Sequence, residues 1–267
     1  MLRTQRSDGD LASHLRLAAQ VLTRRHALRP TPARPVVEAG PPIAPSPARR
    51  LLDIALASAA LLMLWPLFLC VAVATRATTG GSAIYRQRRV GQGGVPFTLF
   101  KFRTMRAWMH GPEVTAPGDA RVTRLGALLR RTSVDELPQL VNVLFGSMTL
   151  VGPRPESVPL AVRYPAECRH VFRYRPGVTG PSQVFVHDDH SLHQVTDVED
   201  FYLSELVPRR VATDMQFLRN PTLSWTVRWL VNTVRYIAGA SARLTLPAPG
   251  PAPQAVESMA MSRGESA

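Results

Sequence analysis

The sequence predicts an α/β fold, mainly helical with a small β element, in a protein attached to a membrane. Three observations predict it. The 21 residues from Ile54 to Ala74 carry no charge, two strand-like stretches flank the turn-forming GQGG at residues 91–94, and residues 123–145 have a mainly helical spacing of apolar side chains. With 267 residues, 45% of them hydrophobic, the chain can hold one sizeable domain with appendages or two small domains.

The uncharged run is long enough to cross a bilayer, because as a single helix it would measure about 31 Å. Arg49 and Arg50 precede it and Arg76 follows it, so the distribution of positive charge gives no orientation. Both ends can stay on the cytoplasmic side if the helix breaks at Pro66, a proline in the middle of the run. We therefore predict a membrane helix over residues 49–76 that is broken near Pro66 and re-entrant, which would make the protein monotopic. A kinked spanning helix is the alternative.

The two ends of the chain differ in composition from the part between them. Residues 1–48 are rich in proline and arginine, and residues 246–267 are rich in proline, alanine and serine. We predict a disordered basic arm and a disordered tail at these ends. The domain outside the membrane then covers residues 77–245.

The net charge of +13 implies an anionic partner, which could be nucleic acid, acidic phospholipid or a phosphorylated substrate. Charge alone does not choose between these partners. Cys70 and Cys168 have neither the spacing of a zinc site nor that of a disulfide framework, which favours a reducing compartment.

Lys101 is the only lysine among 32 basic residues. Period-two alternation in the second strand-like stretch places it on one face with Leu99 and Arg103, so two cations project side by side. A codon bias that favours arginine is one explanation for the single lysine. The other is a site that requires a compact ammonium group, such as a phosphate site.

The densest group of candidate catalytic residues lies in the sequence SVDELPQ. With Asp135 as the N-cap of a helix, Pro138 falls at the third helical position, where its missing N–H costs nothing. Asp135 and Glu136 would then lie at the positive end of the helix dipole, either as capping residues or as a nucleophile or metal ligand beside an anion site. Ser133 and Glu136 have the spacing of a capping box. Arg154, between two prolines, can bind two phosphate oxygens or form a structural salt bridge.

The last predicted helix, residues 225–237, carries Arg228, Asn232 and Arg235 at positions i, i+4 and i+7. Such an amphipathic helix can lie along a layer of lipid headgroups. A surface helix packed on a protein core has the same spacing, so both alternatives stay open.

Three strings follow one another along the chain: RQRRVGQGGVPFTLFKFRTM, then GPEVTAPGDARVTRLGALLRRTSVDELPQLVNVLFGSMTLVGPRPE, then RPGVTGPSQV. Together they resemble the signature of the bacterial sugar transferases, which are monotopic polyprenol-phosphate sugar-phosphate transferases. The resemblance covers about residues 49–243. It implies a catalytic domain on the cytoplasmic face of the bacterial inner membrane, with a re-entrant helix and interfacial amphipathic helices.

The resemblance also implies a reaction, that of a phosphoglycosyl transferase which uses Mg²⁺. Such an enzyme takes a sugar phosphate from a nucleotide diphosphate sugar and places it on polyprenol phosphate, here undecaprenyl phosphate, to start an exopolysaccharide, capsule or O-antigen glycan. Matched residue by residue, Asp135 is the nucleophile that carries a covalent phosphosugar and Glu136 is its partner, and both are the expected metal ligands. The expected phosphate-binding residues are Lys101, Arg103, Arg130 and Arg154.

The sequence departs from the family at two places. Trp65 stands before Pro66, where the family usually has serine. Residues 184–213 replace a commoner segment and precede Asp214, which with Phe217 matches a D-x-x-[YF] motif, and we expect substrate selectivity to differ there. Three histidines of this insert are expected to lie in a polar surface loop and not to bind a metal: His187, His190 and His193.

Two other functions remain open from the residues alone. One is a membrane-tethered binder of anionic lipid or nucleic acid, which the net charge suggests. Nucleic acid is not an expected partner, because no nucleic-acid-binding motif is present and the arginines gather around Asp135. The other is a catalytically silent scaffold of the same fold. The sequence leaves the sugar, the nucleotide, the glycan and the presence of a homodimer undecided.

Overall fold

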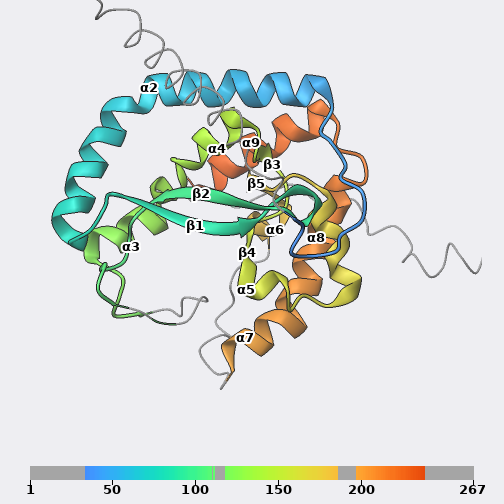
Figure 1. The fold of residues 1–267 in the computed structure, drawn as a ribbon. Coiled ribbons are helices and arrows are strands. Elements are labelled where there is room, and N and C mark those ends of the chain that lie inside the picture. The colour runs from blue at the N-terminus through green and yellow to red at the C-terminus, as the bar shows by residue number, and fades with distance from the viewer. Residues whose placement is uncertain (1–33, 110, 112–117, 186–196, 238–267) are drawn as a thin grey trace, which may run out of the picture. The chain divides into compact units, whose positions relative to one another are not determined.

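The computed structural model describes residues 34–109, 111, 118–185 and 197–237. The chain divides into two compact units, residues 1–34 and 35–267, and the described helices and strands belong to the second (Figure 1). This unit is mostly helical with a small sheet and one long apolar helix, which confirms the predicted fold class in its main features. Residues 1–33 of the predicted arm and the predicted tail lie outside the described residues.

The strands are β1 (Ile84–Val90), β2 (Pro96–Phe102), β3 (Thr149–Val151), β4 (Glu156–Ser157) and β5 (Gly177–Thr179). The α-helices are α2 (Pro47–Thr79), α3 (Arg124–Arg131), α4 (Gln139–Phe145), α5 (Val158–Ala161), α6 (Pro181–Phe185), α7 (Val198–Phe201), α8 (Val207–Leu218) and α9 (Leu223–Ile237). Short 3₁₀ helices are η1 (Gln92–Gly94), η2 (Val134–Glu136) and η3 (Ala166–Arg173), and η5 (Tyr202–Leu206) is a π-helix.

The predicted hairpin is confirmed. Strands β1 and β2 pair antiparallel from Ile84 opposite Phe102 to Val90 opposite Pro96, and β4 adds to the free edge of β1. Glycines 93 and 94 of the connecting turn have φ of 70° and 74°, a conformation that glycine adopts without strain. The hairpin crosses the middle of the molecule in Figure 1 and carries Lys101 near the end of β2.

Two glycine-proline motifs of the sequence meet in a second, two-stranded parallel sheet, β3 and β5. The backbones of Gly152 and Gly177 approach so closely that a Cβ on Gly177 would lie 2.1 Å from the Gly152 nitrogen. Gly152 N–H donates to Thr179 O at 2.9 Å, and Gly177 N–H donates to Pro153 O at 2.9 Å. This contact fixes the loop that carries Arg154, the residue after Pro153.

The long helix α2 begins at a Ser46 N-cap and contains Pro66 in its interior. By length and composition it can cross a membrane, with a mean hydropathy of 2.4 over a window of which only 11% is buried. Figure 1 shows α2 running along one side of the sheet and then bending sharply toward α3, as an interior proline predicts. Helical structure continues through Pro66, so the helix is bent and not interrupted, and its re-entry into the membrane stays a prediction.

The first turns of α2 are bound to the domain through polar side chains. Asp53 is fully buried and accepts hydrogen bonds from Thr149 Oγ1 at 2.6 Å and Leu150 N–H at 3.0 Å. Arg49 donates to Val151 O at 2.8 Å, and Arg50 donates to two carbonyls in the last turn of α4. These two arginines hold the helix on the domain, so they have a structural role besides flanking the apolar run with positive charge.

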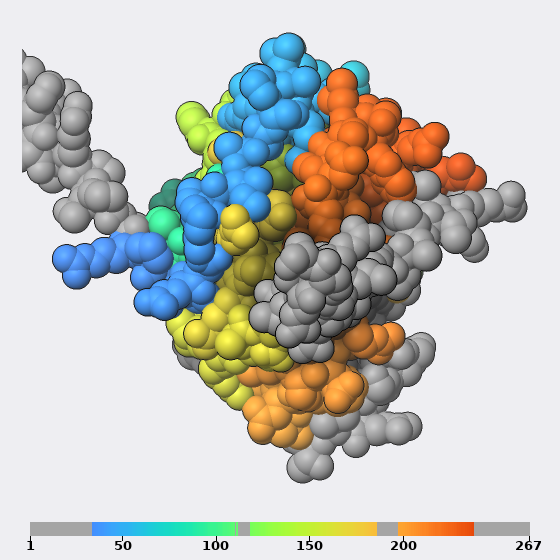
Figure 2. Space-filling model, turned by 90° about the vertical axis from the view of Figure 1, so that its right-hand side faces the viewer, coloured from blue at the N-terminus to red at the C-terminus, as the bar shows by residue number. Residues whose placement is uncertain are grey.

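Part of the predicted disordered arm is ordered. Val36 N–H donates to Gly94 O at 2.9 Å, Val37 is only 4% exposed in the main core, and Ile43 forms a β-bridge with Tyr174. Figure 2 shows this N-terminal stretch, in blue, following the surface of the unit up to α2. The boundary predicted at residue 48 is therefore too late, because backbone pairing and one buried valine hold a segment whose composition indicates disorder.

The insert 184–213 is helical from Val198 onward, where α7, η5 and α8 follow one another. Its three histidines lie outside the described residues. Asp214 of the D-x-x-[YF] motif is buried and accepts hydrogen bonds from the Ser182 backbone N–H at 2.8 Å and hydroxyl at 2.9 Å, so it caps α6. Burial is the first cause that raises the pKa of Asp214, to about 7.

The last helix, α9, differs from the predicted arrangement. Asn232 is 4% exposed and Trp229 is fully buried. The face predicted from Arg228, Asn232 and Arg235 to be polar and exposed therefore partly faces the core. The exposed face instead carries valines 227, 231 and 234, which are 44%, 53% and 66% exposed. An apolar exposed face of this kind suits contact with lipid as well as with protein.

Candidate active site

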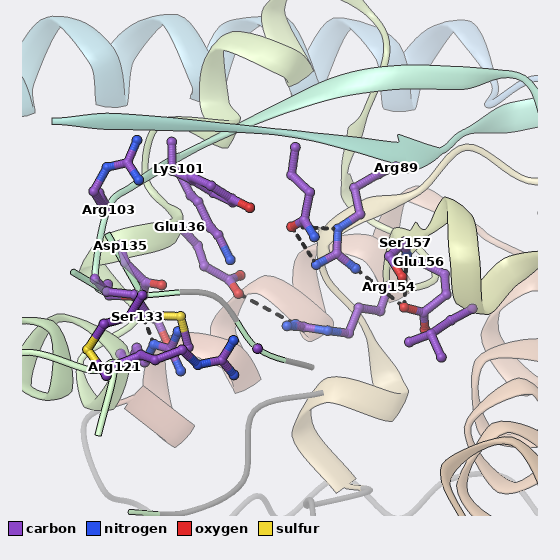
Figure 3. A pocket seen from close by; sticks show the side chains of 18 of the residues that line it. Arg89, Lys101, Arg103, Arg121, Ser133, Asp135, Glu136, Arg154, Glu156 and Ser157 are labelled. Atoms are coloured by element: carbon purple, nitrogen blue, oxygen red, sulfur yellow. Dashed lines mark hydrogen bonds and ion pairs between the residues drawn. The ribbon is translucent and has the colours of Figure 1, made fainter. Parts of the chain in front are cut away.

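A cavity of about 720 Å³ lies between the β1–β2 hairpin, the turn η2 and the strand β4 (Figure 3). All six side chains predicted to carry chemistry line it: Lys101, Arg103, Arg130, Asp135, Glu136 and Arg154. They come from four separate parts of the chain, which the fold brings together. Pro66, the predicted membrane break, lies in α2 and not among the lining residues.

The local structure around Asp135 differs from the prediction. Asp135 lies within the 3₁₀ turn η2, whereas α4 begins at Gln139 with Pro138 as its N-cap residue. The predicted helix cap at Asp135 is therefore wrong, as is the capping box, because the Ser133 side chain forms no cap hydrogen bond. The cause is Ser133 itself, whose φ of 56° turns the chain between α3 and η2.

The φ of Ser133 is the only positive value at a non-glycine position in the described part of the chain. Such a left-handed conformation is strained for a side chain with a Cβ and occurs preferentially at functional sites. Here it lies two residues before Asp135 and directs that side chain into the cavity wall.

Asp135 is 7% exposed, and its pKa is raised to about 6. Burial is the largest cause and the neighbouring carboxylate of Glu136 the second, while the cations Lys101, Arg130 and Arg154 lower the pKa in part. At neutral pH the carboxyl group is therefore mostly ionised yet poorly solvated, which is the state in which a carboxylate is a reactive nucleophile.

Lys101 points from β2 toward Asp135 and Glu136 (Figure 3). Its pKa is lowered to about 8, first by burial and then by the positive charge of Arg89, while Asp135 opposes this shift. The Lys101 Nζ also lies 5.5 Å from the centre of the Tyr85 ring, a distance at which a cation is attracted by the ring face. The ammonium is thus held among charges of both signs close to Asp135.

Two arginines on the cavity wall are oriented through Nε. Arg103 Nε donates to Ser82 O at 2.9 Å, and Arg130 Nε donates to Thr104 Oγ1 at 2.9 Å. The Arg103 guanidinium also stacks 5.3 Å from the centre of the Tyr85 ring. An arginine fixed at Nε can present both terminal nitrogens to an anion in one geometry.

We expect Gly126→Ala to destabilise the domain by roughly 2–4 kcal/mol. A Cβ at Gly126 would lie 2.1 Å from the backbone oxygen of Thr104, the residue that orients Arg130. Helix α3 cannot retreat without loss of its cap, because Gly126 N–H donates to Thr123 Oγ1 at 2.9 Å. Thermal unfolding in detergent measures the effect. Leu128→Ala on the same helix, 46% exposed, is the control, and equal destabilisation by both changes would contradict the argument.

Arg154 forms an ion pair with Glu136, with Nη1 at 3.5 Å from Oε1, and donates to Gln183 Oε1 at 3.2 Å. Gln183 lies on α6, whose first turn is held by the buried Asp214. Arg154 thus connects the acidic pair to the second glycine-proline motif. It remains 44% exposed in its side chain, so a phosphate can reach it.

Several residues of the cavity wall were not predicted. The additional cations are Arg89, Arg106, Arg121 and Arg210. Arg89 could have been found by the period-two pattern of its strand. Arg121 lies within the second string that carried the resemblance but was not singled out, and Arg106 and Arg210 lie outside all three strings. They raise the positive charge of the cavity well beyond the four cations predicted.

Glu156 also lines the cavity but is committed to structural hydrogen bonds. It accepts from Arg89 and from the hydroxyls of Tyr164 and Tyr202, and Arg210 in turn donates to the Tyr202 hydroxyl at 3.1 Å. Burial, and then the charge of Glu156, raise the pKa of Tyr202. This network ties β4 to the insert, so Asp135 and Glu136 are the acids of the cavity wall that lie outside it.

Asp135 and Glu136 are the candidate ligands for Mg²⁺ in this cavity. Adjacent carboxylates on a cavity wall fit this ion, which proteins usually bind through one or two carboxylates together with substrate phosphates and water. No group of three or more acidic, histidine or cysteine side chains with metal-site geometry is found among the described residues. The two carboxylates therefore fit a Mg²⁺ site that a substrate diphosphate would complete.

A family model described as bacterial sugar transferase matches residues 45–240. The chain belongs to this family. It is 38% identical over 199 residues to a UDP-glucose:undecaprenyl-phosphate glucose-1-phosphate transferase of Caulobacter vibrioides, an alignment that covers 73% of this chain and 71% of the relative. A protein of the same name from Escherichia coli is 35% identical over 193 residues, which cover 70% of this chain. The exopolysaccharide production protein ExoY of Rhizobium meliloti is 35% identical over 195 residues, 66% of this chain and 79% of ExoY.

The match to the bacterial sugar transferases confirms the predicted family, and with it a phosphoglycosyl transferase as the enzyme class. The chain spans only 39% of the E. coli relative, so that protein contains much that has no counterpart in the alignment. The long apolar helix and the family together indicate a membrane-associated protein.

Proposed function

We propose that the protein transfers a sugar phosphate from a nucleotide diphosphate sugar to undecaprenyl phosphate through a covalent intermediate on Asp135. The observation that carries this proposal is the position of Asp135, a buried carboxylate with a raised pKa in a cavity walled by one lysine and several arginines. A cavity of about 720 Å³ is also of the size expected for a ligand of several rings.

In the first half reaction, an ionised oxygen of Asp135 attacks the sugar-bearing phosphorus of the donor. The bond from this phosphorus to the oxygen that bridges the two phosphates breaks, and the nucleoside monophosphate leaves with the electron pair. In the second half reaction, a phosphate oxygen of undecaprenyl phosphate attacks the same phosphorus. The bond to Asp135 then breaks, which regenerates the carboxylate and yields a lipid-linked sugar diphosphate.

Both steps bring an anion toward an anion, so the cations of the cavity must offset the repulsion. Lys101 is the cation assigned to the reacting phosphorus, because its charge interacts with that of Asp135. Arg103, Arg130 and Arg154 surround it with donors for the phosphoryl oxygens. Mg²⁺ held by Asp135, Glu136 and the donor phosphates would supply additional neutralisation of charge when bound.

The proposed location is the cytoplasmic face of the bacterial inner membrane, where a soluble donor meets a buried lipid. The bent helix α2 supports this location, with Leu62 and Met63 each 78% exposed in its middle. The likeness to ExoY supports a role in starting an exopolysaccharide or a related glycan. The donor sugar is a further proposal, for which the likeness to glucose-1-phosphate transferases makes UDP-glucose the first candidate.

A panel of nucleotide sugars tests the function. The purified full chain is incubated with Mg²⁺, undecaprenyl phosphate and each donor in turn, and release of the nucleoside monophosphate is followed. We expect release with UDP-glucose and formation of a lipid-linked product in equal amount. Binding to vesicles or nucleic acid without turnover of any donor would instead support a binder of anionic lipid or nucleic acid, or a silent scaffold.

A further inference from the structure

One wall of the cavity is attached directly to the end of the membrane helix. The Ala107 N–H donates to the oxygen of Thr79, the last residue of α2, at 3.0 Å. The ring of Trp108 covers Gly80 so closely that a Cβ there would lie 2.6 Å from the ring. Ala107 and its neighbour Arg106 both line the cavity. The cavity therefore extends to the C-terminal end of α2.

Arg106 differs from the other cations of this wall because it is exposed and uncommitted. Its neighbour Arg121, whose carbonyl accepts from the Arg106 N–H, is bound by Asp119 through both Nε and Nη2, at distances down to 2.6 Å. Within the described part of the chain, the Arg106 guanidinium has no such carboxylate partner. A charged group held at a cavity rim without a protein partner is available to an anionic ligand.

The surroundings of Arg106 indicate lipid. Trp108 is 63% exposed, and tryptophan is enriched where a membrane helix meets the headgroup layer. In Figure 3, Arg103 and Arg121 lie on the Asp135 side of the cavity, whereas Arg89 and Arg154 lie on the side of Glu136. The Arg106 N–H donates to the Arg121 oxygen at 2.9 Å, so Arg106 belongs to the Asp135 side.

We propose that Arg106 binds the phosphate group of the polyprenol phosphate acceptor and takes no part in binding the soluble donor. This inference rests on the proposed function. It assigns the rim next to α2 to the acceptor lipid, and it leaves the donor diphosphate to Lys101 and the cations around it. Arg106 is then a binding residue of the second half reaction alone.

The two half reactions separate this role from a general effect of charge. The full chain is placed in nanodiscs of phosphatidylcholine, which carries no net charge, and Arg106→Gln is compared with wild type. Without undecaprenyl phosphate, the burst of nucleoside monophosphate from UDP-glucose and Mg²⁺ should be unchanged in rate and amplitude. With undecaprenyl phosphate, the KM for the lipid should rise about tenfold, the size of one lost hydrogen bond between charged groups. Arg106→Lys should restore most of the affinity.

Arg88→Gln is the matched control, since Arg88 is exposed on β1 but does not line the cavity. It removes the same charge and should change neither half reaction. An Arg106→Gln burst reduced in proportion to full turnover, or an unchanged KM for the lipid, would overturn the inference. So would an effect that appears only after phosphatidylglycerol is added, because Arg106 would then bind bulk acidic lipid. If wild type releases no nucleotide from any donor, the proposed function itself is wrong.

Discussion

Asp135→Asn is expected to abolish turnover while leaving the protein folded. The amide cannot form the phosphosugar bond, so the burst of nucleoside monophosphate and the formation of lipid-linked product should both fall by at least about 10³-fold. The measurement is nucleotide release with and without undecaprenyl phosphate. Mass spectrometry of the wild-type protein after a burst, without acceptor, should show the sugar phosphate on Asp135.

The same change is expected to stabilise the protein, which separates loss of chemistry from loss of structure. Burial and Glu136 raise the pKa of Asp135 from 3.8 to about 6, so the folded state favours the protonated form. Wild type therefore loses stability as the pH rises from about 4 to about 6 and remains less stable above that range, by on the order of 3 kcal/mol. The asparagine variant does not pay this cost. Thermal unfolding in EDTA should show a higher Tm for it at pH 7.5, and a smaller difference at pH 5.

Glu136→Gln is the matched variant for this comparison. It removes the like charge beside Asp135 but leaves the proposed nucleophile, so we expect a reduced burst that is still measurable. Product formation by Asp135→Asn at a rate near that of wild type would contradict the covalent mechanism. The same holds for a trapped adduct located on Glu136 and absent from Asp135.

The candidate site residues could be named from the sequence because the motifs that contain them are local and ordered. Lys101 and Arg103 follow from strand periodicity, and Arg154 from its place between prolines. Their arrival in one cavity requires contacts that no local pattern encodes. One example is the approach of Gly152 to Gly177, which fixes the loop of Arg154.

The failed predictions have physical causes of the same kind. The position of Pro138 favoured a cap at Asp135, but the left-handed backbone of Ser133 overrides it. A left-handed serine is held by its surroundings and not by its own preference, so it cannot be read from sequence. Composition likewise indicated disorder at Val36 and Val37, where pairing with η1 and burial in the core order the chain.

Lys101→Arg is expected to reduce turnover about 10–100-fold at pH 7 and to remove a limb of the pH profile. Burial and Arg89 lower the pKa of Lys101 to about 8, so the ammonium is lost as the pH rises through that value. In wild type kcat/KM should therefore fall above about pH 8. A guanidinium stays charged there, and the variant should show no such fall.

The reduction in turnover at neutral pH has a separate reason. A flexible point charge can follow the phosphoryl group from nucleotide to Asp135 to lipid, whereas a planar fork holds one geometry best. Lys101 is also half-buried and its Nζ lies 5.5 Å from the centre of the Tyr85 ring, so a larger head group must displace neighbours. The pH profile of kcat/KM and the turnover at pH 7 are measured together. A variant with normal turnover would leave codon bias as the explanation for the single lysine, and an alkaline limb that persists in the variant would assign that limb to another group.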